Sequence, residues 1–232
     1  MQLRFSLFNK ISFFLILFGF IFSNSITAQK TNVTDENGLK QGYWEKKQSN
    51  GSTKYKGQFK DDKPYGKFKY YDKHGTIITI LEYSSPDSAI ATHYHSSGKK
   101  AAYGYYVHQK KEGVWRFYDR TGLLASKENF KDGVLEGEYI VYNLNGSISR
   151  ETFYVKGVEN GYRKTFSSEG ELLTEGNILD GQMDGIQKIY RGGKINIQGA
   201  YKHAVRDGEW NYYDENGELY KTEIYELGIR KN

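Results

Sequence analysis

The sequence contains two series of glycines that recur at a spacing of 24 residues, occasionally 23. The stretch "GVWRFYDRTG", Gly113 to Gly122, returns as "GEWNYYDENG", Gly208 to Gly217, with both glycines, the tryptophan and the aspartate retained. Self-similarity at a fixed period indicates a repeat architecture, in which one small structural unit is copied along the chain. The first series comprises Gly42, Gly66, Gly113, Gly137, Gly161, Gly185 and Gly208, and the second comprises Gly51, Gly75, Gly98, Gly122, Gly146, Gly170, Gly193 and Gly217.

Each unit has the pattern of a β-hairpin. Between the two glycines, bulky side chains alternate with others, as Trp115 and Phe117 do around Arg116, which is the two-residue period of a strand. Segments such as "DRTG" and "DENG" follow, in which Asp favours a type I turn and Gly its left-handed closing residue. The returning strand then reaches a third column of aromatic or aliphatic residues. This third column consists of Phe59, Tyr83, Tyr106, Phe130, Tyr154, Ile178, Tyr201 and Tyr225.

A second glycine turn, such as "KDG" in "KDGVLEG", separates one hairpin from the next, which leaves no room for helices between strands. The 26 Gly, 21 Tyr and 13 Phe residues agree with turns and pleated strands. The sequence therefore predicts an all-β fold: an elongated single-layer antiparallel sheet of about eight tandem 24-residue β-hairpin repeats. The repeat domain should span 42–232, after a lead-in at 29–41, and sixteen strands would form a ribbon about 75 Å long.

The N-terminal segment differs from the repeats. Two positive charges precede the apolar run "ISFFLILFGFIFS", and the small Ala28 follows in "NSITAQK". This arrangement predicts a secretory signal peptide at 1–28 and export to the periplasm, the cell envelope or the exterior. An uncleaved membrane anchor is the alternative, although the run is shorter than the ~20 residues that span a bilayer. Because the chain has no cysteine, its order must come from packing and hydrogen bonds rather than from disulfides.

The pattern Gly-x-Trp-x-Phe-Tyr-Asp-x-x-Gly, followed by a Leu/Ile strand and Tyr/Phe-x-x-Gly, resembles the MORN repeat in its bacterial variant form. Gly113–Gly133 and Gly137–Gly157 carry the pattern, and looser copies extend from Gly42 to Asn232. The resemblance implies an elongated all-β sheet that acts in protein–protein contact or at membrane surfaces, with no catalytic residues. Bacterial proteins with these repeats are often labelled antitoxins of a YwqK-like toxin–antitoxin family.

The sequence contains no nucleophile elbow, phosphate-binding loop or paired-cysteine metal site, and we expect neither enzymatic activity nor a cofactor. His93 and His95 in "HYH" would lie on one face of a strand at a spacing suited to a metal, with His108 in the same unit. The alternative is that these histidines flank a packed Tyr94. No acidic third ligand is obvious, so a metal site is not expected.

One file of aromatic residues, each just before the first turn of its hairpin, is the candidate binding surface. The rings could stack on sugars or hold an extended peptide, or they could join neighbouring hairpins by cross-strand pairing. We expect another protein as the partner, with cell-wall glycan or an anionic membrane surface as alternatives. The net charge of +5 gives no reason to expect nucleic acid. This tyrosine file comprises Tyr71, Tyr118, Tyr142, Phe166, Tyr190 and Tyr213.

Three units depart from the pattern. The third unit has Ala89 in place of the first glycine and also contains Pro86. In the sixth and seventh units, Arg163 and Gln187 replace the bulky residue found at Trp115. The sequence leaves open whether a different face is covered there or a hydrated groove opens.

Overall fold

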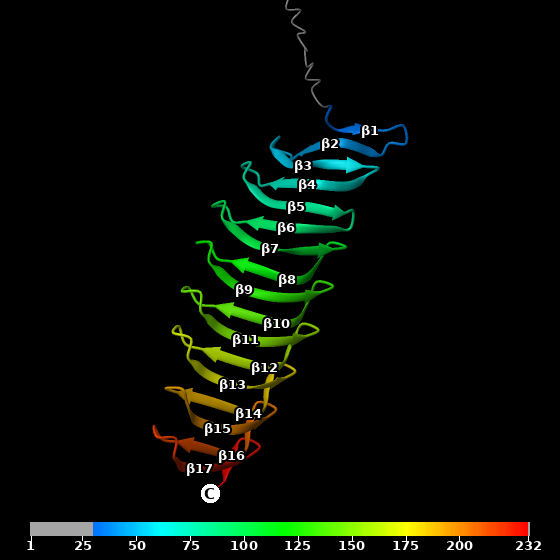
Figure 1. Cartoon of the computed structure of the whole chain (residues 1–232). Coiled ribbons are helices and arrows are strands. Elements are labelled where there is room, and N and C mark those ends of the chain that lie inside the picture. Colours follow the sequence, from blue (N-terminus) through cyan, green and yellow to red (C-terminus); the bar gives the residue numbers. More distant parts are fainter. Residues whose placement is uncertain (1–29, 232) are drawn as a thin grey trace, which may run out of the picture.

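The computed structural model describes residues 30–231, which form one open sheet of β-strands (Figure 1). The predicted signal peptide lies outside these residues. The strands are β1 (Val33–Thr34), β2 (Lys40–Lys47), β3 (Thr53–Lys60), β4 (Lys63–Tyr71), β5 (Ile77–Ser85), β6 (Ser88–Tyr94), β7 (Lys100–Val107), β8 (Lys110–Tyr118), β9 (Leu124–Lys131), β10 (Val134–Tyr142), β11 (Ile148–Val155), β12 (Val158–Phe166), β13 (Leu172–Leu179), β14 (Gln182–Arg191), β15 (Lys194–Lys202), β16 (Val205–Tyr213), β17 (Leu219–Glu226) and β18 (Ile229–Lys231).

Every strand pairs antiparallel with the strand before it and the strand after it in sequence. The ribbon therefore advances by one hairpin per repeat, as Figure 1 shows from β2 to β17. The predicted all-β, antiparallel hairpin architecture is confirmed. The short strands β1 and β18 add to the sixteen expected, and β1 lies within the lead-in at 29–41.

The turn at one end of most hairpins is the predicted type I turn with a left-handed glycine; in the seventh hairpin Gly192 and Gly193, both with positive φ, form a shorter turn. In the fourth unit, the Gly122 amide donates to the Asp119 carbonyl at 3.0 Å, and Gly122 has φ of 91°. The Asp119 carboxylate accepts from the backbone amides of Thr121 and Leu123, at 2.8 and 3.0 Å. Asp is favoured at this position because its side chain satisfies two amides that the turn leaves unpaired.

Apart from the turn at Pro86–Asp87, the turns at the opposite edge contain two consecutive residues with positive φ, the geometry of a type I′ turn. Asp132 and Gly133, with φ of 52° and 85°, form one of them. The Gly133 amide donates 2.9 Å to the carbonyl of Lys111, in the preceding hairpin, and the Asp132 amide donates 2.9 Å to the Glu112 carboxylate. These turns therefore join each repeat to the one before it, and they explain the acidic residue that precedes several first-series glycines.

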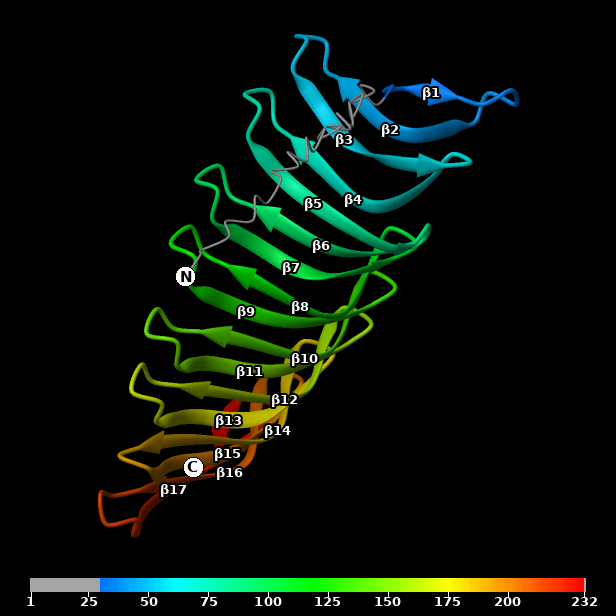
Figure 2. The same ribbon diagram turned by 45° about the horizontal axis from the view of Figure 1, so that its top comes forward.

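The first-series glycines bend the strands. Between the pairs Tyr103↔Arg116 and Tyr105↔Glu112, three residues of β8 lie opposite Gly104 alone, which is a β-bulge. Gly113 lies in this bulge with φ of 65°, a conformation that L-residues rarely adopt. Similar register shifts recur in most units, and the sheet consequently curls along its length (Figure 2).

Curling gives the sheet an inner face, where the core lies along a central column of side chains two positions after the first glycine. Trp115 and Trp210 are fully buried there, with 0 and 1% of their surface exposed. Each indole covers a glycine of the preceding strand, so that a Cβ on Gly104 would lie 2.2 Å from the Trp115 ring. The central column comprises Trp44, Phe68, Ala91, Trp115, Tyr139, Arg163, Gln187 and Trp210.

The polar members of the central column are accommodated by hydrogen bonds. Gln187 covers Gly176 and donates from Nε2 to the Asn177 carbonyl at 2.7 Å. The indole of Trp115 donates the equivalent bond, to the carbonyl that follows its own glycine, at 3.1 Å. Arg163 instead forms an ion pair with Glu159. The column thus continues through the sixth and seventh units with polar side chains in place of rings.

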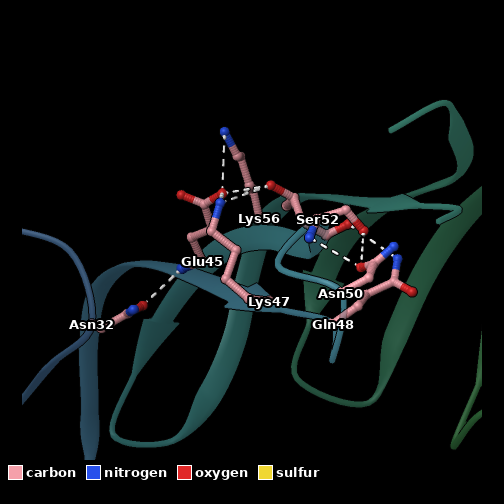
Figure 3. A network of polar contacts seen from close by, with 8 residues as sticks. Asn32, Glu45, Lys47, Gln48, Asn50, Ser52 and Lys56 are labelled. Atoms are coloured by element: carbon pink, nitrogen blue, oxygen red, sulfur yellow. Dashed lines mark hydrogen bonds and ion pairs between the residues drawn. The ribbon is translucent and has the colours of Figure 1, made fainter. Parts of the chain in front are cut away.

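Side chains at the N-terminal edge form a polar network around the first hairpin (Figure 3). The Asn32 side chain accepts from the Glu45 amide at 2.8 Å, which links the lead-in to β2. The Glu45 carboxylate accepts from Thr53 Oγ1 at 2.6 Å and lies 3.7 Å from the Lys56 ammonium. These donors lower the pKa of Glu45 to about 2, mainly through Lys47 and Thr53.

Within residues 30–231, we find no helix of the length and apolarity that membrane crossing requires.

We predict that Ala204→Gly stabilises the protein by about 1 kcal/mol, because Ala204 has φ of 65° in a turn where other repeats have glycine. Thermal unfolding followed by circular dichroism measures the change. The reverse substitution at the equivalent turn position, Gly181→Ala, should destabilise by a similar amount, since no atom within 4 Å would contact the added methyl group. Changes of the same sign in both variants would contradict this account.

We predict that Gly104→Ala destabilises the protein by about 1–3 kcal/mol, because the new methyl group displaces the Trp115 ring. Urea unfolding monitored by tryptophan fluorescence measures the loss. In a Trp115→Ala background the same change should cost much less, so the double-mutant cycle gives a large coupling. Additive effects would show that the ring does not rest on Gly104.

Candidate binding cavity on the inner face

The third unit differs from its neighbours in strand pairing. Between β5 and β6, the pairs Leu81↔Ala91 and Tyr83↔Ala89 belong to one uninterrupted register, without the bulge that first-series glycines produce. Ala89 cannot easily adopt the positive φ of a bulge glycine, so β6 pairs regularly over this stretch. Ala91 also gives the central column a methyl group where the neighbouring units carry Phe68 and Trp115. The inner face consequently has less side-chain volume here.

A cavity of about 630 Å³ occupies this position. Leu81 and Ala89 contribute to its floor, and Pro64 and Pro86, the two prolines of the sequence, contribute to its wall. The volume lies in the range of small-ligand and peptide side-chain pockets.

Four ring side chains border the cavity in two pairs. Tyr70 and His93 occupy equivalent positions in consecutive units, 23 residues apart, and Tyr83 and Tyr106 do the same in the third column. The members of each pair are therefore separated by one repeat along the ribbon. Sequence reasoning placed Tyr83 and Tyr106 in a packing column and did not associate them with a cavity. The small residues at Ala89 and Ala91 were the signal that could have indicated one.

His93 is held by both ring nitrogens. Nδ1 lies 2.9 Å from Thr79 Oγ1, and Nε2 lies 3.4 Å from the Tyr106 hydroxyl. The imidazole also stacks on Trp115, with the ring centres 5.9 Å apart. Burial, together with the nearby Lys111 charge, lowers the pKa of His93, so the neutral imidazole is favoured.

Burial raises the pKa of the Tyr70, Tyr83 and Tyr106 phenols, and Tyr83 contributes to the shift at Tyr70. All three therefore remain protonated at neutral pH. The tyrosine rings that border the cavity are therefore uncharged.

Two charged groups lie near this wall in different environments. The Asp87 carboxylate is at the rim, 67% exposed and 3.9 Å from His108 Nδ1. The Lys111 ammonium lies over the rings of Trp115 and Phe130, at 5.0 and 4.5 Å, and burial lowers its pKa. The Asp87 carboxylate is therefore accessible to a ligand, whereas the Lys111 ammonium packs against core rings.

The proposed histidine pair does not share a strand face, because β6 ends at Tyr94 and His95 opens the following turn. His95 Nε2 lies 2.9 Å from the Tyr118 carbonyl in the next repeat. His108 belongs to a type I′ turn at the opposite edge, with φ of 47°. No group of three or more potential metal ligands from His, Cys, Asp and Glu occurs within the described part of the chain.

The six members of the tyrosine file are half-buried, and all end their strands except Tyr190, which precedes the last residue of β14. Lysine side chains lie on two of them, with Lys100 Nζ 5.6 Å from the Tyr118 ring and Lys127 Nζ 5.6 Å from that of Tyr142. Among residues 30–231, no aromatic pair joins two members of the file; the paired rings belong to the inner face. None of the six residues of the tyrosine file lines the cavity.

Tyr190, also in the file, donates to Glu175 Oε1 at 2.6 Å. The same carboxylate accepts from the Tyr162 hydroxyl at 2.8 Å and from Lys188 Nζ at 3.1 Å. These contacts lower the pKa of Glu175 to about 2, with the hydrogen bond from Tyr190 the largest cause. Tyr213 lines a second cavity of about 510 Å³, near the turn at 191–193.

We predict that the stabilisation contributed by Glu175 is fully present above pH 4.5 and is lost as the pH falls toward about 2. The sign follows because a folded-state pKa below the unfolded value means that the unfolded chain binds more protons in this range. The difference in stability between wild type and Glu175→Gln should therefore shrink on acidification. Urea unfolding at several pH values measures it, with Glu171→Gln, an exposed turn residue, as the control.

The family described as "MORN repeat variant" matches the chain at residues 111–132, 135–156 and 206–226. No curated protein sequence matches the chain significantly. Among solved structures, the chain is similar to S. aureus TarM, crystallised as a point mutant with fondaparinux, alpha-GlcNAc-glycerol and UDP. The match has 12% sequence identity and a TM-score of 0.24, and it covers 62% of this chain and 21% of the TarM chain. A second TarM structure gives 12% identity and a TM-score of 0.22, over 50 and 20%.

The chain spans about a fifth of the length of TarM. The three family matches each cover one hairpin, β8–β9, β10–β11 and β16–β17, within the uniform series of the sheet. MORN repeats are generally non-catalytic and commonly mediate protein or membrane interactions. The sequence matches and the hairpin architecture agree: three hairpins match the MORN repeat variant, and the other hairpins of the sheet share their architecture.

Proposed function

We propose that this protein is an exported, non-catalytic scaffold that binds another protein of the cell envelope through the cavity of its third repeat. The observation that carries the proposal is a cavity of about 630 Å³ bordered by ring side chains, in the repeat that has alanine in place of the first-series glycine. A regular scaffold with one concave, mostly apolar and ring-lined site is typical of binding proteins. The family, whose repeats commonly mediate interactions, supports this function.

The groups around the cavity support binding rather than catalysis. His93 is half-buried and hydrogen-bonded to Thr79 and Tyr106, and the second histidine of the lining, His108, is exposed beside Asp87. The phenols are protonated and held by neighbours. These contacts fix the rings in position, which suits recognition because little side-chain entropy is lost when a partner binds.

Export is proposed from the basic start, the apolar run and Ala28 at 1–28. We place the partner in the cell envelope for the same reason. Bacterial proteins with similar repeats are often labelled antitoxins. That label rests on the resemblance of the repeats, and antitoxin activity is not part of the proposed function.

Binding of cell-wall glycan, or of an anionic membrane surface, through the tyrosine file is the second candidate. It requires free ring faces, and those of Tyr118 and Tyr142 already carry lysine ammonium groups. We therefore favour the cavity, where rings border an open volume.

We predict that the tagged wild-type protein recovers an envelope partner that Tyr83→Ala does not recover, because truncation removes one wall of the cavity. Affinity purification with quantitative mass spectrometry measures the recovery. Tyr201→Ala, in the same column of the seventh unit, is the matched control and should retain the partner. Recovery of no protein above background, or equal recovery by Tyr83→Ala, would reject the proposal.

We also predict that the double variant Tyr118→Ala, Tyr142→Ala sediments with purified cell wall to the same extent as wild type. The measurement is a co-sedimentation assay quantified on gels. A clear loss of sedimentation in the double variant would show that the tyrosine file, rather than the cavity, is the binding surface.

A further inference from the structure

We propose that the third-repeat cavity binds an extended polyproline II segment, with prolines three residues apart packing on Tyr83 and Tyr106 and a basic residue beside Asp87. This inference deepens the proposed function, on which it rests, by assigning the chemistry of the partner's binding segment.

The first argument is a match of periods. Equivalent residues in consecutive hairpins are separated by two strand spacings, about 9.6 Å. A polyproline II helix repeats its faces every three residues, which is an advance of about 9.3 Å. A segment lying along the ribbon axis therefore presents residues i and i+3 at the spacing of Tyr83 and Tyr106. The same spacing applies to Tyr70 and His93 on the other side of the cavity.

The second argument is the composition of the cavity. Tyrosine rings and prolines form its walls, and Leu81 and Ala89 contribute an apolar floor. Aromatic-lined grooves recognise polyproline II segments because the preformed helix loses little entropy on binding. A volume of about 630 Å³ accommodates a few proline rings rather than a folded element.

The third argument concerns hydrogen-bonding capacity. A sugar needs many free donors and acceptors around its ring, but the Tyr106 hydroxyl lies 3.4 Å from His93 Nε2 and the Tyr70 phenol interacts with Tyr83. With these hydroxyls engaged inside the protein, the ring faces are the principal contact surface. The four rings thus offer faces rather than free hydroxyls, which favours proline over a saccharide, and the other polar lining residues are Thr79, Asp87, His108 and Gln109.

The rim supplies the charge preference. The Asp87 carboxylate is exposed at the mouth of the cavity, and His108 Nδ1 lies 3.9 Å from it. An arginine of the segment can pair with this carboxylate through its planar guanidinium. Since other units fill the central column with larger side chains, we expect one segment to bind per chain.

The experiment is isothermal titration of the full chain with three synthetic peptides of equal length. One contains an arginine followed by nine prolines, the second contains prolines only, and the third contains an arginine followed by a glycine–serine repeat. We expect saturable binding of both proline peptides with a stoichiometry of one, and none of the glycine–serine peptide.

Variants assign the binding to the cavity. Tyr83→Ala and Tyr106→Ala should each weaken binding of the arginine–proline peptide at least tenfold, whereas Tyr83→Phe, which retains the ring, and Tyr201→Ala should remain within about twofold of wild type. Asp87→Asn should weaken the arginine-containing peptide about two- to fivefold and leave the proline-only peptide unchanged. Circular dichroism of each variant confirms that the sheet is retained.

Two results would overturn the inference. The first is the absence of binding by both proline peptides, or binding that Tyr83→Ala and Tyr106→Ala leave intact. The second is saturable binding of chitotriose that those variants abolish, without binding of the proline peptides, which would identify the cavity as a sugar site. Recovery of an envelope partner through the cavity, together with either result, would retain the proposed function and reject only the polyproline segment.

Discussion

The contact of a ring with a glycine on the neighbouring strand is the interaction on which the rest of this structure depends. A single sheet has no second layer to cover its apolar face, and it must bury that face against itself. The first-series glycines let each strand bend, and the bend brings Trp115 onto Gly104 with no room for a side chain between them. Both kinds of glycine are needed, one to allow the bend and one to receive the ring. Burial of large rings by a single open sheet follows from these two roles together.

The substitutions in the central column show which part of this interaction is essential. Gln187 covers Gly176 and keeps the hydrogen bond to the following carbonyl that the indoles make elsewhere. The flat side chain and its N–H group are retained although the aromatic ring is lost. Ala91 retains neither; it is fully buried by neighbouring side chains, and the cavity lies in the same repeat. The scaffold thus tolerates polar replacement of a ring but forms a cavity where the ring is removed.

The sequence was sufficient to predict the architecture because its signals are local. Glycine spacing, alternation and turn chemistry around Asp119 and Gly122 each specify structure within a few residues, and repetition removes ambiguity. The signals that failed are non-local. The alternation of side chains within β8 does not reveal that Trp115 rests on Gly104, since Gly104 belongs to the neighbouring strand β7. The cavity escaped detection for the same reason, because it depends on what Ala91 fails to fill. His95 was misplaced because the strand ends one residue earlier than "HYH" suggests.

The type I′ turns have a consequence for how the ribbon responds to force. Each turn donates a backbone hydrogen bond to the preceding hairpin, as Gly133 does to Lys111, so neighbouring repeats are attached through these turns as well as through strand pairing. Tension applied at the two ends would act on these attachments in series, because every hairpin carries the same load. The chain should then extend in steps of one repeat, and each step would release about 85 Å of contour length.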